Sequence, residues 1–152
     1  ELARKYKLNS TIINFIRQHH GNSLIAYFYQ KALEKAKDED QPDEKNFRYP
    51  GPRPQTKEVA IVLLADSVEA SSRSLVDPTP SSITNLVRKV INNKFIDGQL
   101  DECELTLRDM HNISDALIRA LMGIFHTRTS YPQDQSSKGA KSNGNGKGRV
   151  RK

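Results

Sequence analysis

The stretch VAIVLLADSVEA, residues 59–70, is the most apolar part of the chain. With its flanks it predicts a helix over about 56–75 that is buried in the centre of the fold. Asp66 interrupts this apolar run, and a carboxylate is costly to bury unless it is paired or bound to a metal. Asp66 is therefore either a site residue or a residue at the edge of the buried face, where Glu69 and Arg73 would form ion pairs on the same side of the helix.

Two more helices are predicted downstream of this stretch. Thr79–Pro80 provides a capping side chain followed by a proline at the first helical position, which predicts a helix from there to about Phe95. Thr106 and Asp109 have the spacing of a capping box, and the last helix is expected over about 108–126.

Upstream, residues 1–8 are expected to be the end of a helix. A second helix can be capped by Asn9 or Ser10 and should stop at Gly21. Its apolar stripe consists of Ile12, Ile13, Phe15 and Ile16. A third helix is expected from the helical spacing of Leu24, Tyr27, Phe28, Ala32 and Leu33. Because no strand-like alternation and no internal repeat stand out, the predicted fold class is all-α.

The segment NFRYPGPRPQT, residues 46–56, cannot be regular structure, because three prolines and a glycine fall within Pro50–Pro54. It reads as a stiff, shaped loop. Arg48 and Arg53 offer planar donors to phosphate, and Tyr49 offers a ring for base stacking. The alternative is that this loop simply packs its aromatic residues on the core.

Composition limits the possible functions. The chain has 152 residues, the length of one ordinary domain, and a net charge of +6. Residues 133–152 carry six basic residues and one acid, so the remainder, 1–132, is nearly neutral. Residues 1–132 are therefore predicted to fold and 133–152 to form a disordered basic tail, and a nucleic-acid-binding face is not expected.

Several classes of site are excluded. The single cysteine, Cys103, rules out a disulfide framework, and neighbouring acids make it a poor nucleophile. No phosphate-binding glycine loop, G-x-S-x-G motif or pair of CxxC motifs occurs. No run approaches the roughly 18 apolar residues of a membrane span. His111 and His126 are expected to be ordinary surface or interhelical residues.

The adjacent pair His19–His20 is the clearest candidate for metal binding. Neighbouring helical residues point about 100° apart, so both imidazoles can approach one pocket. Neutral imidazole is a good ligand for zinc, iron, manganese or nickel. The structural alternative places both rings in the last helical turn, where histidine interacts well with the helix dipole.

Four segments together resemble a known family: HHGNSLIAYFYQKA, FRYPGPRPQTKEVAIVLLADSVEASSRSL, DGQLDECELTLRDMHNI and GIFHTRTSYP. They resemble the cytoplasmic domain of seven-transmembrane receptor-type HD-domain phosphohydrolases, bacterial membrane proteins of the kind that degrade cyclic di-AMP. The resemblance covers about residues 1–132. It implies an HD-domain-like helical bundle with a pair of divalent metal ions, manganese or iron.

The family motif runs H, HD, H, HH, D. The HH matches His19–His20 and the final D matches Asp66, so the resemblance implies that these three residues are metal ligands. The first H, the HD pair and the third H have no counterpart in this sequence. The chain is therefore expected to be the C-terminal part of the domain, N-terminally incomplete. The resemblance also implies a membrane-anchored parent protein, with this domain on the cytoplasmic face.

The implied function is metal-dependent hydrolysis of cyclic di-AMP to pApA, with Arg48, Tyr49, Arg53 and Arg73 as candidate substrate-binding residues. A fragment with part of the ligand set is expected to be inactive alone. An apolar patch left by absent helices would favour self-association. The alternatives are a module that binds a cyclic dinucleotide or nucleotide without hydrolysis, and a purely structural helical domain.

Overall fold

The structure, a computed structural model, describes residues 1–36 and 41–127. In chain order its elements are α1 (Leu2–Lys5), α2 (Ser10–Gln18), α3 (Ala26–Lys35), a 3-10 helix η1 (Glu44–Phe47), α4 (Lys57–Ser72), α5 (Pro80–Ile96) and α6 (Leu107–Thr127). Within these residues, extended pairing is confined to an isolated bridge between Leu24 and Arg48. The prediction of an all-α fold is confirmed.

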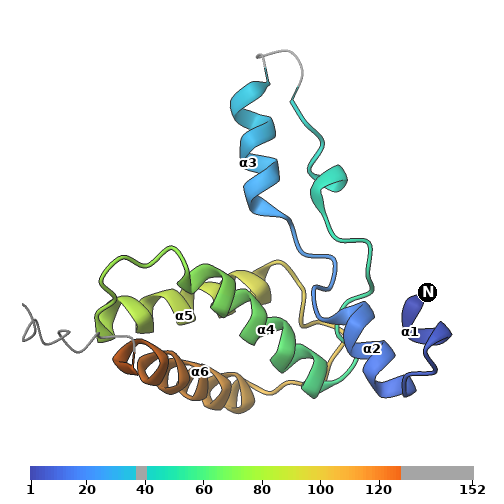
Figure 1. The fold of residues 1–152 in the computed structure, drawn as a ribbon. Coiled ribbons are helices and arrows are strands. Elements are labelled where there is room, and N and C mark those ends of the chain that lie inside the picture. Colours follow the sequence, from blue (N-terminus) through green and yellow to red (C-terminus); the bar gives the residue numbers. More distant parts are fainter. Residues whose placement is uncertain (37–40, 128–152) are drawn as a thin grey trace, which may run out of the picture.

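Helices α4, α5 and α6 pack together and form the core of the fold (Figure 1). Their buried side chains follow the helical repeat, which places them on one face of each helix. The cluster consists of the helical residues Ala60, Leu63, Leu64, Val68, Ile83, Val87, Ile91, Ile118 and Leu121, together with Leu100 from the turn after α5. The apolar stretch quoted above therefore does contribute the centre of the core, but Ile61 and Val62 of α4 lie on its exposed side.

The starts of the core helices are fixed by side-chain caps. The Thr56 hydroxyl accepts a hydrogen bond from the Val59 N–H at the start of α4. Thr79 and Ser82 form a reciprocal capping box at the start of α5. The predicted cap of α6 is also present: Asp109 N–H donates to the Thr106 hydroxyl, and Thr106 N–H donates to the Asp109 carboxylate. These caps satisfy backbone donors that the helices leave unpaired.

The Asp109 cap leads to a prediction about pH. Hydrogen bonds from Thr106 and an ion pair with Lys57, 3.1 Å away, lower the pKa of Asp109 to about 2. Because the folded-state pKa lies below the unfolded value of about 3.9, this contribution is present above pH 4 and is lost as the pH falls through 2. Asp109→Asn is expected to lower the Tm by a few degrees at pH 7, with the difference shrinking toward pH 2. Thermal unfolding followed by circular dichroism at pH 7, 4 and 2.5 measures it. A deficit that stays constant over this range would contradict it.

The N-terminal part is arranged differently from the core. Helix α2 packs against one end of α4, whereas α3 and η1 lie beside each other and project away from the bundle (Figure 1). Two expectations are wrong here. Leu24 lies before α3, in the bridge with Arg48, and residues 46–47 belong to a 3-10 helix although the whole of 46–56 was expected to be irregular.

Several predicted apolar contacts are exposed. Ile12 and Ile16 of α2 are 49% and 51% exposed, and Tyr27 and Phe28 of α3 are 63% and 58% exposed. The physical reason is that no described element covers these faces. Self-association through them stays a prediction. The predicted end of the fold at Tyr131–Pro132 and the basic tail lie outside the described residues.

Candidate functional site

The two adjacent histidines lie where α2 ends. Gln18 is the last residue of α2 and His19 is its C-terminal cap. Gly21 then adopts a φ of +56°, a left-handed conformation that turns the chain away from the helix axis. The Nδ1 atom of His19 lies 2.8 Å from the Phe15 carbonyl oxygen. Since a carbonyl can only accept, Nδ1 carries the proton, and Nε2 of the neutral ring is left with a lone pair.

Asp66 is brought to His20 by the packing of α2 against α4. The distance from His20 Nδ1 to Asp66 Oδ2 is 3.4 Å, and the side chains are 39% and 47% exposed. Asp66 therefore lies at the edge of the buried face, and its role as a site residue stays a prediction. The His19 and His20 ring centroids are 4.0 Å apart. His20 thus contacts both of the other residues matched to the family motif, at a solvent-accessible place.

The electrostatics of this place favour a neutral imidazole. Burial and the neighbouring His19 lower the pKa of His20 and outweigh the opposing effect of Asp66. A neutral ring has the lone pair that a metal needs.

Two imidazoles and a carboxylate suit divalent manganese, iron or zinc. Among the residues that the structure describes, no group of three or more His, Cys, Asp or Glu side chains is gathered closely enough to hold a metal ion. The donor atoms of these residues fit part of a metal centre, and the described residues do not supply a complete set of ligands.

The proline-rich segment forms the wall next to the histidines. Tyr49 stacks on His20, with ring centroids 4.3 Å apart and an angle of 17° between the ring planes. Its backbone N–H donates to the Ser23 carbonyl. A pocket of about 340 Å³ lies between this segment and the end of α2, and its lining includes Arg17, His20 and Tyr49. A cation, an imidazole and an aromatic ring are a combination that suits a phosphorylated aromatic ligand.

Arg48 lies near Tyr49 but has a different environment. Its guanidinium makes hydrogen bonds to the carboxylates of Glu44 and Asp97, each with a shortest distance of 2.7 Å, and to the Asn22 carbonyl. The hydrogen bond that Arg48 donates to Asp97, reinforced by the one to Glu44, raises the pKa of Arg48. This fork joins η1 to the end of α5 and to the turn after His20, so it holds the wall in place.

The other two candidate arginines are paired with carboxylates of their own. The Arg53 guanidinium approaches Asp101, with 3.4 Å between Nη1 and Oδ2. Arg73 pairs with Glu69 one helical turn earlier, at 2.8 Å, and both side chains are largely exposed. The expectation that Arg73 pairs with Glu69 or Asp66 is met with Glu69.

Sequence reasoning missed two polar residues, Lys94 and Gln99, that bind the turn after His20. The Lys94 ammonium donates to the Ser23 hydroxyl at 2.7 Å. Gln99, which is fully buried, binds Asn22 through both its amide oxygen and its amide nitrogen. A signal existed for Lys94, because it continues the buried stripe of α5 formed by Ile83, Val87 and Ile91.

The remaining candidates behave as expected. His111 lies on the exposed side of α6, 3.4 Å from Asp115. Burial, with a smaller effect from Asp101, raises the pKa of the Cys103 thiol, which makes it a poor nucleophile.

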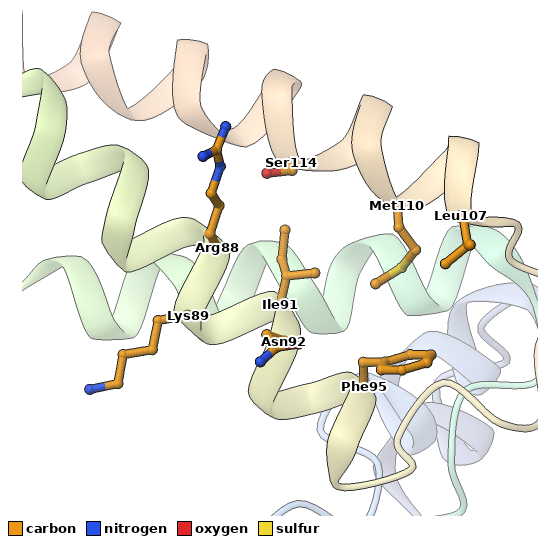
Figure 2. A pocket seen from close by; sticks show the side chains of 8 residues that line it. All are labelled: Arg88, Lys89, Ile91, Asn92, Phe95, Leu107, Met110 and Ser114. Atoms are coloured by element: carbon orange, nitrogen blue, oxygen red, sulfur yellow. The ribbon is translucent and has the colours of Figure 1, made fainter.

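A second pocket, of about 680 Å³, lies between α5 and α6 (Figure 2). Figure 2 shows Arg88 directed toward α6 near Ser114, and Phe95, Met110 and Leu107 at the other end. None of the sequence-predicted site residues lines this pocket. The larger pocket therefore lies apart from the residues that the sequence predicts as the site.

The chain was compared with known proteins. It is 48% identical over 132 residues to the cyclic-di-AMP phosphodiesterase PgpH of Bacillus subtilis and 43% identical over 135 residues to PgpH of Listeria monocytogenes. An uncharacterised protein of Synechocystis is 37% identical over 134 residues. These matches cover 87–89% of this chain but only 16–18% of the relatives. No protein-family model matches.

The fold agrees with solved structures of the same relative. The HD domain of L. monocytogenes PgpH in complex with cyclic di-AMP superposes with a TM-score of 0.76 at 42% identity. The match covers 86% of this chain and 60% of the solved one. The same domain in a second structure gives a TM-score of 0.73. This chain is homologous to part of the PgpH HD domain, as the sequence motifs indicated.

Proposed function

We propose that this chain, as a homologue of part of the PgpH HD domain, contributes the His–His and Asp segments of a metal-dependent phosphodiesterase that hydrolyses cyclic di-AMP to pApA. The observation that carries the proposal is the contact of His20 with Asp66, beside His19, in a chain 48% identical to a PgpH protein. The HD phosphodiesterase family implies metal use, and these three residues are the donors that the motif resemblance assigns to this chain.

The residues have distinct roles in this proposal. His19 is oriented by the Phe15 carbonyl, so its Nε2 atom is the one that would bind a metal ion. His20 would bind from the turn after α2, and Asp66 from the middle of α4. Two divalent ions, manganese or iron, would supply an activated water and neutralise a phosphodiester oxygen. Because the described residues do not gather a full ligand set, the proposal requires further ligands from outside them.

Substrate binding is assigned to the wall and pocket beside His20. Tyr49 offers its ring to an adenine base, and Arg53 is proposed to reach a phosphate from the edge of the same loop. Arg48 is proposed to support this wall through Glu44 and Asp97. Arg73 would reach a phosphate only after leaving Glu69.

The proposal also includes a cellular location for the parent protein. By analogy with the receptor-type family, the parent protein is a multi-pass membrane protein with this domain on the cytoplasmic face of the bacterial membrane. Among the described residues, no helix has the length and apolar character needed to cross a bilayer.

The test is a hydrolysis assay on a complete HD domain, in which this chain is extended to the length of the solved relatives. With manganese, wild type is expected to convert cyclic di-AMP to pApA. His20→Ala and Asp66→Ala should each reduce kcat/KM by at least about 100-fold, because each removes a metal ligand. Circular dichroism and bound-metal analysis check that the variants fold and have lost metal. Arg119→Ala, at an exposed position of α6 with no role in the proposed site, is the matched control and should retain activity within a few-fold.

Two outcomes would contradict the proposal. A folded, metal-loaded wild type that yields no pApA would refute hydrolysis; if it still binds cyclic di-AMP without metal and His20→Ala binds equally well, the chain belongs to a binding module. Strong hydrolysis by the 152-residue chain alone would refute the requirement for further ligands.

A further inference from the structure

Lys94 occupies an unusual position for a lysine. It lies near the end of α5 on the face that carries the core residues Val87 and Ile91, and it is half-buried. Its ammonium donates a hydrogen bond of 2.7 Å to the hydroxyl of Ser23. Ser23 is three residues after His20, and its backbone N–H binds the His20 carbonyl oxygen. Lys94 is therefore attached to the turn that carries the histidines.

The charge of Lys94 is not matched by a direct ion pair. Within the described residues, no carboxylate oxygen lies within 4.0 Å of the Lys94 ammonium. Asp97 is taken by Arg48 at 2.7 Å and by Gln99 at 2.8 Å, and Asp66 is taken by His20. A half-buried cation held only by a neutral hydroxyl is costly, and an anion beside it removes much of the cost.

The ammonium also lies within electrostatic range of the candidate site. Its charge lowers the pKa of His20, and the charges of Asp97 and Asp66 act in turn to raise the pKa of Lys94. Burial outweighs these charges and lowers the pKa of Lys94, which agrees with an incompletely compensated cation. An anion bound beside the histidine–aspartate contact would therefore lie within electrostatic range of the Lys94 ammonium.

We propose that Lys94 is a phosphate-binding residue of this site, whose ammonium, positioned by Ser23, binds a non-bridging phosphate oxygen of the dinucleotide substrate. The inference rests on the proposed function and adds to it a cation that the sequence motif does not contain. A lysine fixed before the substrate arrives loses little conformational freedom on binding.

The competing explanation is that Lys94 only holds Ser23 in place. Three variants of the complete HD domain separate the two. Lys94→Met keeps the length of the side chain and removes the charge, Lys94→Arg keeps the charge, and Ser23→Ala removes the hydroxyl while leaving the ammonium. If Lys94 binds phosphate, Lys94→Met should raise KM for cyclic di-AMP and weaken pApA binding, measured by calorimetry, by about tenfold or more. Lys94→Arg should recover much of the loss, and Ser23→Ala should cost less than Lys94→Met.

The salt dependence gives a second readout. Affinity of wild type for pApA should fall as sodium chloride rises, and the fall should be less steep for Lys94→Met, because one charge has left the site. If Lys94→Met does not fold, Lys94→Gln is measured in the same way.

The outcomes separate this inference from the proposed function. An active wild type with unchanged KM, pApA affinity and salt dependence in Lys94→Met would overturn the inference alone, and so would equal losses in Lys94→Met and Ser23→Ala. If wild type does not hydrolyse cyclic di-AMP, the proposed function fails, and the inference then depends on equilibrium binding of cyclic di-AMP. Binding that Lys94→Met weakens supports it, and no binding or equal binding overturns it.

Discussion

Replacing Gly21 with alanine is expected to lower the free energy of unfolding by about 2–4 kcal/mol. The φ of Gly21 is +56°, a conformation that residues with a Cβ adopt only with strain. A Cβ at this position would overlap the amide oxygen of Gln99 and would lie 3.3 Å from Leu63 Cδ1. Gln99 and Leu63 are both fully buried, so neither can move aside cheaply. Urea unfolding followed by circular dichroism measures the change.

Gly123 in α6 provides the matched control. A Cβ there would meet no heavy atom within 4 Å, and the residue is in a regular helix. Gly123→Ala is therefore expected to raise the free energy of unfolding by about 0.5–1 kcal/mol, opposite in sign to Gly21→Ala. If both substitutions had the same small effect, the turn after His20 would not have the tight packing described above.

The parts of the fold that were predictable depend on neighbouring residues. The apolar run 59–70, the cap at Thr79–Pro80 and the Thr106–Asp109 box each lie within one or two helical turns, so the sequence displays them directly. The same is true of Gly21, whose positive φ follows from its position at a helix end. These local signals were sufficient for the helix order and for most helix boundaries.

The parts that were not predictable depend on packing between distant segments. The binding of Arg48 to Asp97 joins residues 49 positions apart, and no pattern in the sequence pairs them. Exposure of Ile16 and Tyr27 depends on which elements cover them, a property that an amphipathic pattern does not contain.

The candidate site also has a part that was predictable from the sequence and a part that was not. His19, His20 and Asp66 were singled out by their residue types and positions, the motif resemblance implied that they are metal ligands, and the structure then placed His20 against Asp66. Lys94 could have been found without the structure, since a lysine at a core position of α5 is as unusual as Asp66 in α4. The difference is that no motif drew attention to it.

Gln99 leads to the second large expected effect. Its amide oxygen accepts from the Asn22 N–H at 3.1 Å, and its amide nitrogen donates to the Asn22 side chain at 2.7 Å and to Asp97 at 2.8 Å. Gln99→Leu keeps the approximate size but removes all of these hydrogen bonds. The Asn22 N–H loses its acceptor in a partly buried place, whereas Asp97 keeps the hydrogen bonds from Arg48. We expect a loss of about 3 kcal/mol in the free energy of unfolding, because each unsatisfied buried group costs about 1–3 kcal/mol.

Gln99→Glu tests the same hydrogen-bond network by replacing the amide with a carboxyl group that can become charged. The new oxygen would face the Asp97 carboxylate and the Asn22 side-chain oxygen, so the charged form is disfavoured in the folded protein and the pKa of Glu at this position rises above its unfolded value of about 4.3. Its stability deficit is therefore small below about pH 4.3 and grows as the pH rises through the folded-state pKa. Urea unfolding at pH 5 and pH 7 should show a larger deficit at pH 7 for Gln99→Glu and an equal one at both for Gln99→Leu. If Gln99→Leu were as stable as wild type, the turn that carries His20 would be held by other contacts, and Arg48 with Asp97 would be the first to examine.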